Sequence, residues 1–182
     1  MNAESGIEDA EVIVQPNNGY GSPEQIRRLL KEIKFDAIFL ITDPRYFSWL
    51  FQIENEIRKD IPIIYLNIWD DYPAPMYNRA FYESCDALLA ISKQTKLINE
   101  LVLGDKAKNK VIEYIPHGLN HHDYYPVHLS HSLKKDEELE ELDKFRSQVF
   151  QGKEKDFVLL FNSRNIRRKM IPDTMLAFKY FL

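Results

Sequence analysis

A basic turn after an apolar run carries the clearest chemistry in this sequence. Residues 157–161 read Phe-Val-Leu-Leu-Phe, and the segment that follows contains Ser163, Arg164 and Lys169, with two further arginines before the lysine. A parallel strand that feeds a helix leaves its carboxyl end open, where backbone N–H groups and cationic side chains can hold a phosphate. The pattern therefore predicts an anion site on these three residues. A solvated basic loop is the alternative.

A second group of candidates follows the apolar run at residues 61–68. Trp69, Asp70 and Asp71 come at its end, and in open α/β sheets ligand groups collect at the carboxyl ends of strands. They could bind ligand hydroxyls or a divalent ion, or they could be solvated loop residues. His117 and Gly118 follow a later strand-like run, and we expect Gly118 to allow a backbone turn that a Cβ atom would obstruct.

Other combinations of metal-binding or catalytic residue types give little indication of a site. His117, His121, His122 and Asp123 have metal-binding side chains, but adjacent histidines on a flexible connector do not easily face one ion, so we expect no metal. No Ser-His-Asp set, Walker loop or zinc-ligand spacing occurs in the sequence. Cys85 is the one cysteine, which excludes an intramolecular disulfide and indicates a reduced, cytoplasmic setting.

The elements that must position these residues alternate between strands and helices. Strand-like runs occur at residues 12–14, 36–42, 61–68, 86–91 and 111–115. The run at 36–42 lacks alternation, which is typical of a strand buried on both faces. Helical patterns lie between the runs, with Ser22 and Ser92 as N-caps and one helix expected over residues 43–59. Residues 1–118 therefore predict an α/β domain, a Rossmann-like parallel sheet with helices on both faces.

The chain changes character after residue 118. Residues 119–151 read as a connector and a charged helix over 132–151, and residues 152–182 as the first strand and helix of a second Rossmann-like domain, with the helix beginning at Pro172. A lone strand and helix cannot bury their own apolar side. We therefore expect this part to lean on the first domain, on another copy of the chain in a homo-oligomer, or on sequence absent here.

The composition is that of a globular protein. Apolar residues make up 45% and charged residues 29%, and the net charge is −4. The negative balance argues against nucleic acid as the main partner. No apolar run approaches the roughly 18 residues that span a bilayer, and the N-terminus lacks the parts of a signal peptide. We expect a cytoplasmic protein without a transmembrane segment, with peripheral membrane binding left open.

Three stretches, in this order, resemble the group 1 glycosyltransferases of the GT-B fold. Residues 85–95 are similar to that family's segment of an Asp, an apolar strand, a Ser and a Thr. Residues 115–120, Ile-Pro-His-Gly-Leu-Asn, look like its connector between domains, and residues 157–169 look like the first strand and basic turn of its second domain. The resemblance covers roughly residues 36–182.

The resemblance implies transfer of a sugar from a nucleotide-sugar donor to an acceptor sugar, lipid or protein, with retained anomeric configuration and with no cofactor or metal. It implies that Ser163, Arg164 and Lys169 hold the donor diphosphate, whose growing negative charge two cations would stabilise. The residues implied for acceptor or sugar contacts are Trp69, Asp70, His117 and Gly118.

The same resemblance shows parts that this sequence lacks. Family members have a Gly-rich acceptor loop, which Gly19-Tyr20-Gly21 is too short to replace, and paired glutamates that would come after Leu182. Where many members have a His after the strand at 61–68, this chain has Asn67-Ile68-Trp69-Asp70. We therefore expect a fragment of a larger enzyme, inactive by itself. The alternatives are a non-catalytic, truncated GT-B-like binding module and a nucleotide-sugar epimerase of the same fold.

Overall fold

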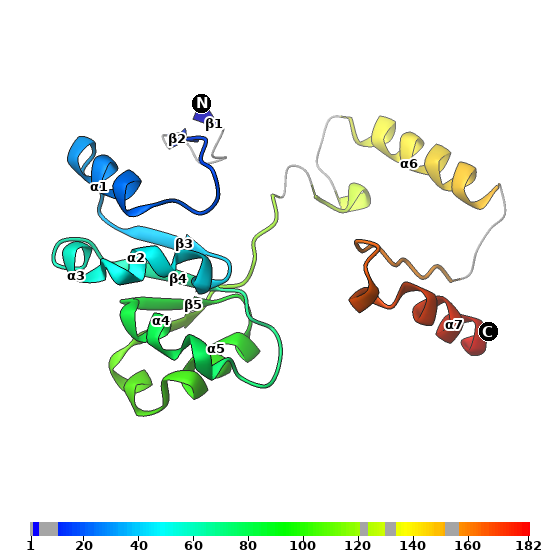
Figure 1. Ribbon diagram of the computed structural model, residues 1–182. Coiled ribbons are helices and arrows are strands. Elements are labelled where there is room, and N and C mark those ends of the chain that lie inside the picture. The colour runs from blue at the N-terminus through cyan, green and yellow to red at the C-terminus, as the bar shows by residue number, and fades with distance from the viewer. Residues whose placement is uncertain (1, 4–10, 121–123, 130–133, 152–156) are drawn as a thin grey trace. The chain divides into compact units, whose positions relative to one another are not determined.

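The computed structural model describes residues 2–3, 11–120, 124–129, 134–151 and 157–182 (Figure 1). The chain divides into two compact units, Met1–Gly118 and Leu119–Leu182, and each is described by itself. Among the described residues, no helix is both long and apolar enough to cross a lipid bilayer.

The first unit begins with a small hairpin and a capped helix. β1 (Asn2–Ala3) pairs antiparallel with β2 (Val12–Ile13). α1 (Pro23–Glu32) starts as the sequence predicts, because the Ser22 hydroxyl accepts a hydrogen bond from the Gln25 N–H at 3.2 Å and a proline occupies the first turn. The predicted N-cap is therefore confirmed.

Four parallel strands form the sheet of the first unit, and their order in space is their order in the chain. They are β3 (Ile38–Ile41), β4 (Ile63–Asn67), β5 (Ala87–Ala90) and β6 (Val111–Tyr114). The register aligns Phe39 with Ile64, Ile64 with Ala87, and Ala87 with Val111. An α/β unit with a parallel sheet is thus confirmed.

Short helices make the three crossovers between these strands. After β3 come η1 (Pro44–Phe47), α2 (Ser48–Gln52) and α3 (Glu54–Ile57); after β4 come η2 (Met76–Asn78) and α4 (Arg79–Ser84); after β5 come α5 (Lys93–Leu103) and η3 (Gly104–Asn109). The prediction of one helix over residues 43–59 is wrong, because the backbone leaves helical geometry at Ile53, with φ −112° and ψ 15°. The predicted cap of α5 is confirmed, since the Thr95 N–H donates to the Ser92 hydroxyl at 3.0 Å.

One face of the sheet holds the core. Ile63, Tyr65 and Leu88 are fully buried there against Leu50, Tyr82 and Ile98 of the crossover helices. Each such aliphatic side chain contributes on the order of 2 kcal/mol when it leaves water. α1 packs on the same side, because Ile26 and Leu30 touch this core, and an Arg27–Glu56 ion pair at 2.8 Å links α1 to α3.

Helices cover only one face of the sheet within the described part of the first unit, so the prediction of helices on both faces is wrong here. Right-handed crossovers between strands that run in chain order all fall on the same side. Phe39, Ile41 and Val111 of the other face are 50%, 51% and 57% exposed. The strand at 36–42 is correspondingly an edge strand with an open side, and is not buried on both faces as predicted.

The second unit contains helices and an extended segment. Its elements are η4 (Val127–Leu129), α6 (Lys135–Phe150), η5 (Arg167–Lys169) and α7 (Ile171–Phe181). The two predicted helices are present. The predicted strand at residues 157–161 is wrong, since these residues are exposed and form no strand. A strand needs a hydrogen-bonded neighbour, and the described residues of this unit provide none.

Candidate functional site

The carboxyl edge of the sheet gathers most of the sequence candidates of the first unit, because parallel strands end on the same side. Asp43 follows β3, Trp69 and Asp70 follow β4, and His117 follows β6. Thr42, between β3 and Asp43, has φ 91°. A β-branched residue in that region carries about 1–3 kcal/mol of strain, a feature that concentrates at functional sites.

Asp43 and Arg45 form a tight ion pair at the end of β3. Asp43 Oδ1 accepts hydrogen bonds from the Arg45 N–H at 3.0 Å and from Arg45 Nε at 2.9 Å, while Oδ2 accepts from Nη2 at 2.5 Å. Hydrogen bonding to the guanidinium lowers the pKa of Asp43, and the carboxylate in turn raises the pKa of Arg45. The pair is therefore fully ionised at neutral pH, and its two charges offset each other.

Aromatic rings lie close to this ion pair in the sequence or in space. The Tyr20 and Tyr46 rings stack with centroids 4.3 Å apart and planes within 3°. The Arg45 guanidinium lies 5.2 Å from the centroid of the Tyr77 ring, and Tyr77 meets Trp69 edge to face at 6.0 Å. We call Tyr20, Tyr46, Tyr77 and Trp69 the aromatic strip. It spans the loops that follow β2, β3 and β4.

A glycine contact holds one end of the aromatic strip. Gly21 has φ 93°, and a Cβ atom there would lie 2.7 Å from Trp49 Cζ2. Trp49 Nε1 also donates to the Tyr20 carbonyl at 3.1 Å, and Phe47 packs edge-on against the Tyr20 ring. The Tyr20 loop is therefore fixed against α2 by contacts that only glycine permits.

Hydrogen bonds from two elements hold the other end of the strip. The Trp69 N–H donates to Asn67 Oδ1 at 3.0 Å, and Thr95 Oγ1 donates to the Trp69 carbonyl at 2.7 Å. The indole Nε1 donates to the Asp71 carbonyl at 2.7 Å, and Gln94 Nε2 reaches the Asp70 carbonyl at 3.3 Å. The loop is thus preorganised, and the exposed carboxylate of Asp70 has no protein partner among the described residues.

A buried polar network supports this loop from below. Asn67, which is 1% exposed, donates from Nδ2 to the Tyr82 hydroxyl at 2.8 Å and to Asn99 Oδ1 at 2.5 Å. Burial raises the pKa of Tyr82 to about 12, so its phenol stays protonated. Paired polar groups in a core resist rearrangement because separating them leaves buried groups unsatisfied.

The other sequence candidates of the first unit lie apart from the strip. His117 and Gly118 are exposed and follow β6, two strands away from β4 in the sheet. The expected role of Gly118 is wrong, because a Cβ atom there would meet nothing within 4 Å and its φ is not in the left-handed region. The histidines at 121 and 122 and Asp123 lie outside the described residues. Within the described ranges, no group of three acidic, His or Cys side chains could hold a metal.

The candidate donor residues lie together in the second unit. Ser163 and Lys169 are half-buried, and Arg164 is exposed. The Ile166 N–H donates to the Arg164 carbonyl at 2.8 Å and the Lys169 N–H donates to the Ile166 carbonyl at 2.9 Å. These bonds form a compact basic turn just before α7. Its two further arginines, in η5, are exposed.

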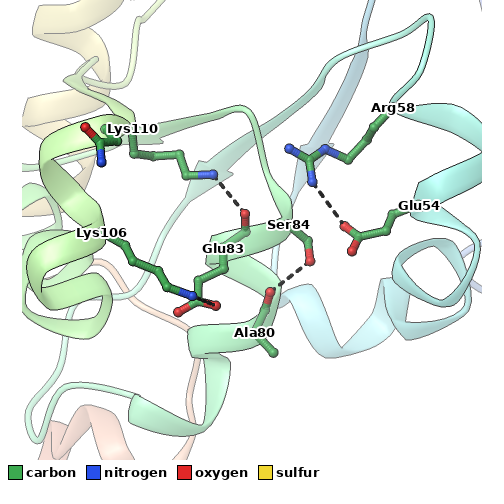
Figure 2. Close-up of a pocket in the computed structure, with 8 residues that line it drawn as sticks. Glu54, Arg58, Ala80, Glu83, Ser84, Lys106 and Lys110 are labelled. Carbon is green, nitrogen blue, oxygen red and sulfur yellow. Dashed lines mark hydrogen bonds and ion pairs between the residues drawn. The ribbon is translucent and has the colours of Figure 1, made fainter.

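A charged pocket of about 490 Å³ occurs at the opposite, amino edge of the sheet (Figure 2). Its cations are already paired: Arg58 Nη2 with Asp86 at 2.7 Å, Lys106 with Glu83 at 2.7 Å, and Lys110 with the Glu83 carbonyl at 2.8 Å. Burial lowers the pKa of Lys110, which also donates to the Cys85 carbonyl. These contacts join the starts of β4, β5 and β6 and give the pocket a structural role.

Sequence reasoning missed Tyr20, Arg45 and Tyr46. The one sequence signal for them was the glycine on either side of Tyr20, which indicated a backbone conformation that other residues rarely adopt. Comparison with protein-family models, with curated proteins and with solved structures finds no significant match to this chain. The geometry of the carboxyl edge is therefore the evidence for what this site binds.

Proposed function

We propose that the chain acts in a glycosyl transfer reaction of the GT-B type, in which a nucleotide-sugar donor gives its sugar to an acceptor bound at the carboxyl edge of the first unit. The observation that carries the proposal is the bond from Thr95 Oγ1 to the Trp69 carbonyl. Thr95 belongs to the stretch at 85–95 that resembles the family, and Trp69 belongs to the loop with the candidate acceptor residues. Two stretches that the resemblance singles out therefore meet at one place.

The electrostatics of the second unit support a donor phosphate there. In the reaction, the bond between the anomeric carbon and the diphosphate oxygen breaks, and its electron pair leaves with the diphosphate. The sugar then bonds to an acceptor hydroxyl oxygen, whose proton is released. Arg164 and Lys169 would stabilise the departing charge more in the transition state than in the ground state, and arginine can do so through two parallel hydrogen bonds.

Nucleotide binding tests the donor part of the proposal. We expect UDP or GDP to bind the full-length protein in calorimetry, and the double change Arg164→Ala with Lys169→Ala to weaken binding more than tenfold. Lys179→Ala is the matched control, because this cation lies in the last turn of α7, away from the basic turn. Unchanged affinity in the double variant would overturn the phosphate assignment.

Product analysis then separates the reaction from its rivals. The full-length protein is incubated with a panel of nucleotide sugars and neutral acceptors, and products are identified by mass and by NMR. A new glycoside with retained configuration supports transfer. An epimerised nucleotide sugar identifies an epimerase, and bound but unaltered nucleotide identifies a non-catalytic module.

A further inference from the structure

We propose that the aromatic strip is a binding surface for an uncharged oligosaccharide, which makes an extended neutral glycan the acceptor class; this assignment rests on the transfer reaction proposed above. The strip consists of Tyr20, Tyr46, Tyr77 and Trp69. Tyr20 lies before α1, Tyr46 lies in η1 after β3, and Trp69 and Tyr77 follow β4, with Tyr77 in η2.

The rings are exposed and are of the amphipathic kind. Tyr20, Tyr46 and Tyr77 are 48%, 51% and 58% exposed, and Trp69 is half-buried. Tyrosine and tryptophan combine a large apolar face with a polar edge, and a sugar ring has the same combination, with C–H groups on its faces and hydroxyls around its rim.

The charges around the strip favour a neutral ligand. The Arg45 guanidinium touches the strip at Tyr77, and the Asp43 carboxylate already engages this guanidinium through two of its nitrogens. Asp70 and Asp71 add two exposed carboxylates beside Trp69. These carboxylates would repel a phosphate or sulfate, which disfavours nucleic acid and anionic glycans as ligands. Carboxylates accept hydrogen bonds from hydroxyl groups, as a sugar requires.

The arrangement of the rings favours several linked sugar residues. The Tyr20 and Tyr46 rings are parallel and stacked, so each covers one face of the other and only the outer faces can meet a ligand, whereas Trp69 and Tyr77 meet at 77° and form a corner. The Asp43–Arg45 pair contacts the second of these parts, because the Arg45 guanidinium lies over the Tyr77 ring, and Arg45 is next to Tyr46 in the chain. One sugar ring can cover one aromatic face, so the strip suits a chain that crosses both parts.

The supporting contacts reduce the cost of binding. Gly21 and Trp49 fix the Tyr20 loop, while Thr95 and Asn67 fix the Trp69 loop. Loops that are ordered before the ligand arrives lose less conformational entropy on binding. The strip is therefore a preorganised surface, which is what weak stacking contacts need in order to give measurable affinity.

Tryptophan fluorescence tests the proposal directly, because both tryptophans of the chain contact the strip. The probes are maltotriose, cellotriose, chitotriose and mannotriose, with the corresponding monosaccharides and a panel of neutral and anionic glycans on an array. We expect at least one neutral trisaccharide to change the emission, with an affinity about tenfold or more above that of its monosaccharide.

Ring variants separate stacking from folding. We expect Tyr46→Ala and Tyr77→Ala each to weaken the best trisaccharide about fivefold or more, as loss of one stacking contact requires. Tyr46→Phe keeps the ring and should bind nearly as well as the original chain. Tyr180→Ala is the matched control, because Tyr180 is a 79% exposed tyrosine in α7 of the second unit.

The possible outcomes are distinct. Binding of no neutral glycan, binding of anionic glycans alone, or equal affinity in Tyr46→Ala and Tyr77→Ala would overturn the assignment. Trisaccharide binding that depends on the rings, without any nucleotide binding, would support the oligosaccharide surface and reject the transfer reaction. Nucleotide binding without glycan binding would do the reverse.

Discussion

Replacement of Gly21 by alanine tests the contact that orders the aromatic strip. Two costs add at this position. The backbone has φ 93°, where an L-residue loses about 1–2 kcal/mol. The new Cβ would also lie 2.7 Å from Trp49 Cζ2, and overpacking of this kind costs about 1–3 kcal/mol. We therefore expect Gly21→Ala to lower the free energy of unfolding of the first unit by about 2–5 kcal/mol.

Two other glycines provide matched controls. Gly19 has φ 77° and nothing within 4 Å of an added Cβ, so Gly19→Ala carries the backbone cost alone, about 1–2 kcal/mol. Gly118 has neither a left-handed φ nor a near neighbour, so Gly118→Ala should be neutral or stabilising by a few tenths of a kcal/mol. The difference between the Gly21 and Gly19 variants isolates the contact with Trp49.

Urea denaturation followed by tryptophan emission measures these differences, because the change in midpoint multiplied by the slope gives the free energy. Trp49→Phe removes the Cζ2 atom, so combining it with Gly21→Ala should recover part of the loss as a coupling energy. If Gly21→Ala costs no more than Gly19→Ala, or if Trp49→Phe recovers nothing, the close approach of this glycine to the indole is refuted.

Two further predictions concern the amino edge of the sheet. Burial alone would raise the pKa of Asp86, but hydrogen bonds from Arg58 and from the Ile63 N–H at 2.8 Å outweigh it and lower the pKa below 3.8. The ionised Asp86 therefore stabilises the folded chain by about 1–2 kcal/mol after screening by solvent, and this contribution is present above pH 3.8 and lost as the pH falls below it. In Asp86→Asn, the free energy of unfolding measured from pH 6 to 2 should lose this pH dependence. An unchanged pH profile in the variant would contradict the assignment. Burial raises the pKa of the Cys85 thiol to about 12, so a thiol reagent at pH 8 should label the native chain at least a hundredfold more slowly than the urea-unfolded chain, whereas equal rates would show an accessible thiol.

Local signals in the sequence predicted the elements of the first unit well. Ser22 and Ser92 mark helix starts because their side chains replace missing backbone partners, and this requires nothing from the rest of the fold. Four of the five apolar runs mark the strands of the parallel sheet for a similarly local reason, and the run at 12–14 contributes β2 to the small antiparallel sheet. The break at Ile53 has no such signal, since a helical pattern of apolar residues continues through it.

Features that depend on strand order could not be predicted in the same way. Phe39 and Ile41 are as apolar as the buried Leu40 between them, so hydrophobicity alone does not reveal that their face is open. Tyr46 and Tyr77 look like core residues in a sequence with 13% aromatics. Their place on the strip depends on contacts between loops about 30 residues apart in the chain, which periodicity does not encode.

The order of the strands also has a consequence for how the first unit folds. Each strand pairs with the next one in the chain, and partners such as Ile38 and Ile63, or Ala87 and Val111, are 25 and 24 residues apart. Every strand of this parallel sheet pairs with a segment nearby in the chain, so each pairing closes a loop of similar length and costs a similar, modest loss of chain entropy. The sheet can therefore assemble strand by strand from its amino-terminal side, in the order in which a ribosome releases it.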